Sequence, residues 1–176
     1  YVTPNVTARP LAGVRPAEPL REPEWGVHGF SYAHLVQPVL DQYCTECHNV
    51  RDRAGGVDLS GDKTDFFNVS YDFLARKGVI GQWHYEQLNV GKFPLGQNPY
   101  TSWIATYNNT EDNILEVSPK AWGSPASLLA DLILAGHPDE DGQPRVTLSA
   151  AEQQRIYTWI DLNVPYFGTW HEFREI

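Results

Sequence analysis

The 176-residue chain contains no methionine, only two cysteines, and no apolar run near the roughly 18 residues that span a membrane. Basic residues are also scarce, with 13 Lys and Arg against 22 Asp and Glu, for a net charge of −9. Nucleic acid is therefore not an expected partner, and neither is a membrane span. The first residues carry no leader peptide, so the sequence is interpreted as a processed mature protein or a piece of a longer polypeptide.

The length suits one domain with a true core, since a domain of about 150 residues buries about 70% of the surface of its unfolded chain. Residues 1–24 differ from the rest, with five prolines and little apolar periodicity. This composition predicts an extended proline-rich arm or linker, with simple disorder as the alternative. Residues 25–176 are expected to form the single folded domain.

Apolar periodicity predicts a first helix within "SYAHLVQPVLDQYC" (31–44). Ser31 is its expected N-cap, and Pro38 either kinks the helix or marks its true first turn. A loop rich in Gly, Asp and Asn follows over residues 49–70, and a short helix is expected over residues 71–76.

A second clear helix is predicted within "GSPASLLADLILAGHP" (123–138). Ser124 is its expected N-cap, Pro125 occupies the first helical position, and Gly136 stops the helix. Pro138 lies just beyond the stop.

A third helix is predicted within "LSAAEQQRIYTWIDLNVP" (148–165), where Ser149 and Glu152 have the spacing of a capping box. No segment alternates in the manner of a strand. Residues 79–120 carry no clear signal, and their role is not assigned. The fold class is therefore mostly α with long irregular loops.

Both cysteines stand in "CTECH" (44–48), at the end of the first predicted helix. In a haem c site, two thiols at this spacing add across the haem vinyl groups, and the histidine that follows binds the iron. The pattern predicts one covalent haem c, held by thioether links from Cys44 and Cys47, with His48 as proximal iron ligand. A helix that ends at the motif is what a cytochrome c-like fold requires, because that helix packs beside the haem.

Three other interpretations of the motif are weaker. A structural zinc site needs four ligands, and only two cysteines exist with no His-x₃₋₅-His pair after them. A thioredoxin-like dithiol follows a strand and opens a helix, whereas this cysteine pair ends one. A structural disulfide between cysteines three positions apart is uncommon.

Methionine, a frequent sixth ligand of haem iron in cytochromes c, is absent. The remaining candidates are an open position or one of His28, His34, His84, His137 and His171. His137 is favoured because it follows the helix stop at Gly136 and precedes Pro138, which would hold it rigidly at the edge of the core. His84, flanked by two aromatic residues, is the alternative.

Four stretches resemble the planctomycete-type cytochrome c domain found at the C-terminal end of the hydrazine synthase alpha subunit and its relatives. They are "FSYAHLVQPVLDQYCTECHN" (30–49), "AGGVDLSGD" (54–62), "SPASLLADLILAGH" (124–137) and "LSAAEQQRIYTWIDLNVPYFGTW" (148–170). They cover somewhat more than a third of the chain, in the order of the family. The resemblance implies a helical cytochrome c domain with a bis-histidine haem, whose distal ligand would be His137.

Two filled axial positions favour transfer of single electrons over catalysis, at a lower potential than a His/Met haem would have. One alternative is a haem enzyme or gas-binding domain with an open iron site, and another is a structural haem domain that docks a larger hydrazine-synthase-like complex. The expected partners are redox proteins or other domains and subunits of a larger complex. Because bacteria attach haem c outside the cytoplasmic membrane, a periplasmic, equivalent extracytoplasmic or secreted location is expected.

Overall fold

The computed structural model describes residues 13–76, 104, 120 and 123–172. Within these residues the chain forms helices, turns and irregular segments but no strand, so the predicted mostly-α class is confirmed there. The predicted irregular region 79–120 lies outside the described residues, apart from two positions. No helix of the described segments has both the length and the apolar character needed to cross a membrane.

The first helical segment is a π-helical turn, η2 (Tyr32–Val36), that continues into α1 (Gln37–Tyr43). The Gln37 amide donates to the carbonyl of Tyr32, five residues back, and Pro38 follows in the first turn of α1. Pro38 has no amide N–H, and it stands at the junction where the π-helical turn passes into α1. Ser31 is the N-cap of η2 as predicted, but its hydroxyl donates to Glu172 and caps no backbone amide.

A loop leads from α1 through the short 3₁₀ turn η3 (Ala54–Gly56) to a second helical segment. That segment consists of α2 (Val69–Tyr71) and the π-helical turn η4 (Asp72–Arg76), so the short helix predicted over residues 71–76 is present and begins two residues earlier. Asn68 caps it, because its side chain accepts from the Tyr71 amide.

The predicted helix over residues 123–138 is split in two. Ser124–Ala126 form a 3₁₀ turn, η6, and α4 spans Leu128–Leu134 with Ser127 as its N-cap. The prediction of Ser124 as the N-cap of the whole helix was therefore wrong. Its amide and hydroxyl both donate to the carboxylate of Asp161 instead, at 2.7 and 3.1 Å.

Helix α5 (Ala150–Asp161) begins where the sequence predicted. The Ser149 hydroxyl accepts from the Glu152 amide, and the Glu152 carboxylate accepts from the Ser149 amide at 2.7 Å, so the capping box is confirmed. The same carboxylate accepts from the Tyr43 phenol at 3.0 and 3.2 Å. This contact joins the end of α1 to the start of α5.

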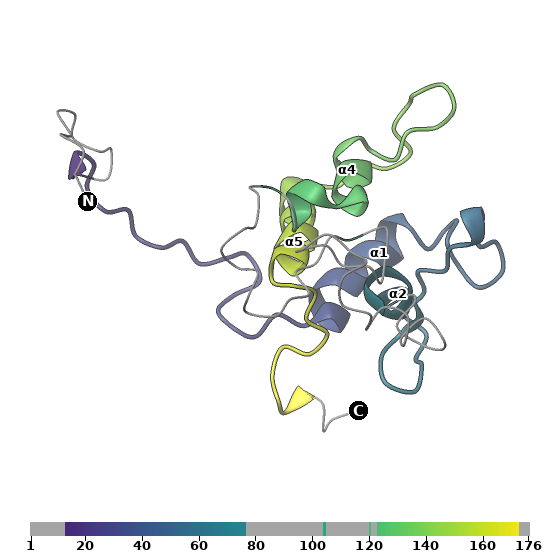
Figure 1. Ribbon diagram of the computed structural model, residues 1–176, viewed down its shortest axis with the longest axis horizontal. Helices are drawn as coiled ribbons and strands as arrows, with labels where there is room; N and C mark the ends of the chain where they lie inside the picture. Colours follow the sequence, from purple (N-terminus) through teal and green to yellow (C-terminus); the bar gives the residue numbers. More distant parts are fainter. Residues whose placement is uncertain (1–12, 77–103, 105–119, 121–122, 173–176) are drawn as a thin grey trace, which may run out of the picture.

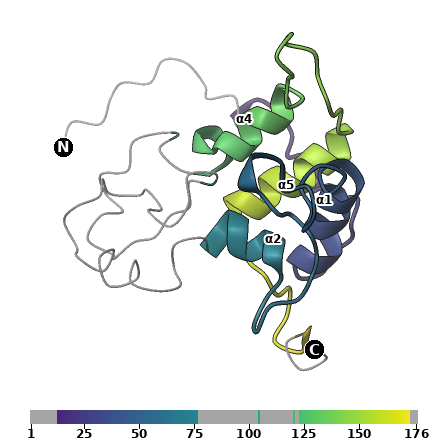
Figure 2. The same ribbon diagram turned by 90° about the vertical axis from the view of Figure 1, so that its right-hand side faces the viewer.

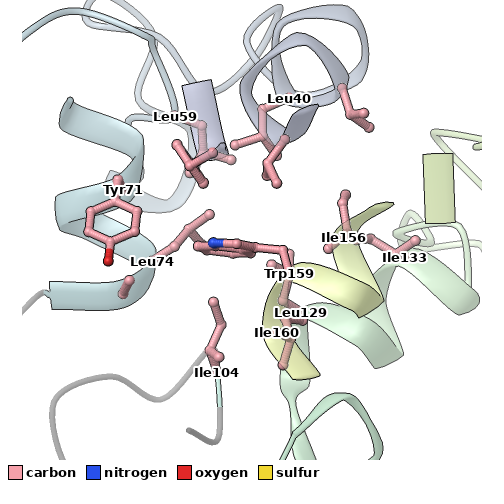
Figure 3. Close-up of a cluster of buried hydrophobic side chains, with 14 of the residues drawn as sticks. Leu40, Leu59, Tyr71, Leu74, Ile104, Leu129, Ile133, Ile156, Trp159 and Ile160 are labelled. Carbon is pink, nitrogen blue, oxygen red and sulfur yellow. The ribbon is translucent and has the colours of Figure 1, made fainter. Parts of the chain in front are cut away.

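Helix α5 lies between α4 on one side and the η2–α1 segment on the other (Figures 1 and 2). Its residue Trp159 is completely buried at the centre of the core (Figure 3). The indole ring packs against Tyr32 at a centroid distance of 4.9 Å, and its N–H donates to the carbonyl of Pro165 at 3.0 Å. Ile104 reaches the same core and is 1% exposed.

The described part of the predicted arm, residues 13–24, extends away from the helices (Figure 1). It has no regular helix or strand over residues 16–23, and nearly all of its side chains are exposed. Glu24, at its end, lies 3.5 Å from the guanidinium of Arg155 on α5.

Candidate functional site

The motif at residues 44–48 forms a tight turn directly after α1. Cys44 is the C-cap of the helix, and its amide donates to the carbonyl of Leu40 at 2.8 Å. The carbonyl of Cys44 in turn accepts from the amides of Cys47 and His48, at 3.2 and 2.9 Å. The helix therefore ends at the cysteine pair as predicted, and the turn holds all three side chains on one short loop.

The two thiols face different surroundings. Cys44 is half-buried against the hydrophobic core, whereas Cys47 is exposed, and both are free thiols. Burial, with a smaller contribution from the negative charge of Asp41, raises the pKa of Cys44 to about 11. A nucleophilic dithiol needs the opposite shift, which favourably placed positive charge or a helix N-terminus supplies. Cys44 instead stands at the negative C-terminal end of a helix.

His48 is positioned by its backbone. Its amide donates to the carbonyl of Cys44, and its own carbonyl accepts from the amide of Leu59 at 2.9 Å. The imidazole is half-buried, and its Nδ1 is buried without a hydrogen-bond partner among the described residues.

His137 is held by the stop of α4. Its amide donates to the carbonyl of Leu132 at 2.7 Å, and its φ of 47° places it in the left-handed region. The preceding residue, Gly136, has a φ of 74°, and a Cβ there would lie 2.6 Å from the Cβ of Pro144. Its carbonyl accepts from the amide of Val146 at 3.1 Å. The predicted stop at Gly136 is confirmed, and only glycine fits this close approach.

The stop of α4 and the turn after α1 bring the two histidines together. The ring centroids of His48 and His137 lie 6.0 Å apart, with 57° between the ring planes. Burial first, and then electrostatic interactions with Arg145 and His48, lower the pKa of His137 below its ordinary value of 6.5. A lowered pKa favours the neutral imidazole, which is the form that binds metals.

This spacing suits two ligands on opposite sides of one metal. A histidine nitrogen binds a metal at about 2 Å and the ring centre lies about 1 Å further, so two such rings have centres about 6 Å apart. A haem iron takes its other four ligands from the porphyrin, and therefore needs only these two from the protein. The residues present fit the iron of a haem.

A bare metal ion fits less well. No group of three or more His, Cys, Asp or Glu side chains converges anywhere in the described ranges 13–76 and 123–172. A structural zinc ion needs four protein ligands, and a catalytic one needs three. The neighbouring pairs Cys44/Cys47 and His48/His137 consequently do not combine into such a site.

The other histidines are differently placed. His28 and His171 are exposed, and His34 is exposed with its Nε2 3.6 Å from Glu172, near the C-terminal end of the described chain. None of the three makes a recorded ring contact with His48. The alternative ligand His84 lies outside the described residues.

Sequence reasoning missed two residues, Leu59 and Gln37, that support the turn at residues 44–48. Leu59 binds the carbonyl of His48 through its amide, and Gln37 binds the carbonyl of Leu59 through its side chain at 3.1 Å. The one signal in the sequence was a polar residue, Gln37, on the apolar face of the first helix, between Val36 and Val39.

No family model matches the chain, and no curated protein or solved structure matches it either. The resemblance to the planctomycete-type cytochrome c domain stays a prediction made from the sequence. What the chain does has to be inferred from its own residues.

Proposed function

We propose that the chain is a monohaem c-type cytochrome domain that transfers single electrons through a covalent, bis-histidine haem. The observation that carries the proposal is the opposition of His48 and His137 at 6.0 Å, beside a turn that bears both cysteines of the chain. The planctomycete-type family is the one that its sequence resembles.

Each residue of the site has a role in this proposal. Cys44 and Cys47 hold the haem through thioether links, His48 is the proximal iron ligand, and His137 is the distal one. The bound haem supplies a reversible one-electron couple. The chain's own contribution is to hold two neutral imidazoles in fixed positions, which keeps the ligand set the same in both oxidation states.

Two protein ligands leave no position on the iron for a substrate. A reaction at the iron would first have to displace an imidazole, and the backbone at His137 is tightly held by the stop of α4. This supports electron transfer over a haem enzyme or gas-binding domain. Two histidines also give a lower potential than a His/Met pair, since methionine ligation raises it.

The exposure of the cysteines suggests how electrons reach the site. Cys44 packs against the core and Cys47 is exposed, so the two thiols that would hold the haem are accessible from solvent at Cys47. The net charge of −9 favours a basic redox partner, or a basic face on another domain or subunit of a larger complex. Haem c attachment implies a periplasmic or equivalent extracytoplasmic location, or secretion.

Spectroscopy of the purified protein tests the proposal. A pyridine haemochrome assay tests covalent attachment, and a spectrum of the reduced protein with and without CO tests the sixth position. We expect one haem c per chain, low-spin iron in both oxidation states, and little CO binding. High-spin ferric iron with rapid CO binding would instead establish an open distal site.

The distal ligand is tested by substitution. We expect His137→Ala to turn the iron high-spin, and His34→Ala, at an exposed histidine, to leave it low-spin. If His137→Ala stays low-spin while His84→Ala turns high-spin, His84 is the ligand. If the chain attaches no haem, the proposed function is wrong.

A further inference from the structure

Gln37 has a buried side chain whose hydrogen-bonding capacity is completely used. Its Nε2 donates to the carboxylate of Asp41 at 2.7 Å and to the carbonyl of Leu59 at 3.1 Å. Its Oε1 accepts from Asn68 at 3.2 Å and from the hydroxyl of Ser70. The residue is only 5% exposed. A glutamine with two donors and two acceptors all satisfied is strongly fixed in orientation, because losing any partner leaves a buried polar group unpaired.

One of these four bonds leads to the proximal histidine. Leu59 links α1 to the turn at residues 44–48. Its carbonyl accepts from the side chain of Gln37 on α1, and its amide donates to the carbonyl of His48. Leu59 itself is buried, with an exposed fraction of 6%. The loop at Leu59 therefore connects a side chain of α1 to the backbone of the turn that ends at His48.

The imidazole of His48 lacks the support that metal-binding histidines usually have. Such a histidine normally donates its second ring N–H to a carboxylate, carbonyl or water, which fixes the orientation of the ring. Nδ1 of His48 is buried without a partner among the described residues. The position of the ring therefore depends on its backbone, and that backbone is held by Cys44 on one side and Leu59 on the other.

We propose that Gln37 is a positioning residue for the proximal histidine: through the Leu59 peptide it fixes the backbone of His48 and so keeps His48 bound to the iron. This inference rests on the proposed haem c function. No hydrogen bond joins Gln37 to His48 directly, so Gln37 acts through Leu59. Its bonds to Asp41 and Asn68 hold its amide in the orientation that presents the N–H to the Leu59 carbonyl.

A pair of variants separates this role from general stabilisation. Gln37→Met keeps the length of the side chain and removes all four bonds. Ser70→Ala removes one bond to Gln37 and the acceptor of the Tyr32 phenol, but leaves the Gln37–Leu59 bond in place. Both variants lose buried hydrogen bonds, so both are expected to be less stable than the parent protein.

Hydrogen exchange of the Leu59 amide and CO binding by the reduced protein are the two readouts. We expect Gln37→Met to exchange the Leu59 amide at least tenfold faster and to bind CO at least tenfold faster, because the proximal turn can move away from the iron. Ser70→Ala should leave both rates within about twofold of the parent. Equal changes in the two variants, or no change in Gln37→Met, would overturn the proposal.

A further variant covers the case in which Gln37→Met does not fold. Gln37→Glu keeps an acceptor oxygen for Ser70 and Asn68. Its carboxyl carries at most one proton, and the facing carboxylate of Asp41 is a stronger acceptor for that proton than a carbonyl, so the Leu59 carbonyl loses its donor. The variant should raise both rates at neutral pH in the same way, and unchanged rates would count against Gln37. The pyridine haemochrome assay is done first on the parent protein. If the parent carries no covalent haem, the proposed function is wrong. If it carries the haem and the Gln37 variants have the same two rates as the parent, only the positioning role is wrong.

Discussion

The phenol of Tyr43 on α1 donates to the carboxylate of Glu152 on α5, with both carboxylate oxygens within 3.2 Å. Tyr43 immediately precedes Cys44, and Glu152 completes the capping box of α5. Glu152, in the first turn of α5, thus also holds the end of α1, the helix that leads into the proposed haem-binding motif.

The hydrogen bonds of Glu152 with Ser149 and Tyr43 predict that part of the free energy of unfolding depends on pH. Hydrogen bonds from Ser149, and further from Tyr43, lower the pKa of Glu152 below its ordinary value of 4.5, against a smaller opposing effect of burial. A carboxyl whose folded-state pKa is lowered stabilises the fold above the unfolded-state pKa, and that contribution is lost as the pH falls through the folded-state pKa.

Ser149→Ala should therefore lower the free energy of unfolding by about 1 kcal/mol at pH 7, the usual loss for an N-cap. The difference from the parent should shrink as the pH falls below 4.5. Denaturant titrations followed by circular dichroism at a series of pH values measure it. Glu140→Gln, at an exposed acid, is the control and should show no such trend. A difference that stays constant down to pH 3 would contradict the role of Glu152.

Gly136 and Gly142 offer a matched pair of substitutions near His137, the proposed distal ligand. Their φ values are 74° and 77°, but an added Cβ would clash with Pro144 at Gly136 and meet nothing within 4 Å at Gly142. Gly142→Ala should cost about 1 kcal/mol, through backbone strain alone. Gly136→Ala should cost clearly more and should also give partly high-spin iron, because it displaces His137. Equal losses, with low-spin spectra in both variants, would show that the stop does not position the ligand.

The thiols should differ in reactivity before haem is attached. At pH 8, Cys44 should be alkylated by iodoacetamide roughly a hundredfold more slowly than Cys47, because burial raises its pKa to about 11 and restricts access. Mass spectrometry of peptides over a time course measures the two rates. Urea provides the control, since the rates should become similar in the unfolded chain. Similar rates in the folded chain would contradict the different surroundings of the two thiols.

Two tryptophans test the assignment of the core. Trp159 is 0% exposed and Trp170 is 91% exposed. Trp159→Ala should lower the free energy of unfolding by about 3–5 kcal/mol, because it leaves a large cavity at the centre of the core. Trp170→Ala should change it by less than about 0.5 kcal/mol. A thermal or chemical denaturation series measures both, and a small loss for Trp159→Ala would mean that the core is packed differently.

Local signals in the sequence predicted much of the helical structure. The capping box at Ser149, the stop at Gly136 and the end of the first helix at Cys44 are all present. Each depends on residues a few positions apart, so its physical cause is contained in a short stretch of chain. Ser124 shows the limit of this reasoning. Its amide and hydroxyl donate to Asp161 on α5, which is far away in the sequence, and Ser124 does not cap the helix that it was expected to cap.

The sequence by itself determined the chemistry that the site can have: two thiols and a histidine at fixed spacing, with no methionine to complete an iron site. Only the tertiary structure brings His137 next to His48, because that depends on how α4 and the η2–α1 segment pack on the two sides of α5. It also decided the hydrogen bonds of Gln37, a polar residue on an apolar face whose partners Leu59, Asn68 and Ser70 come from distant parts of the chain. Such partners cannot be predicted from periodicity, because a buried hydrogen bond is set by which segments meet and not by the order of residues within one of them.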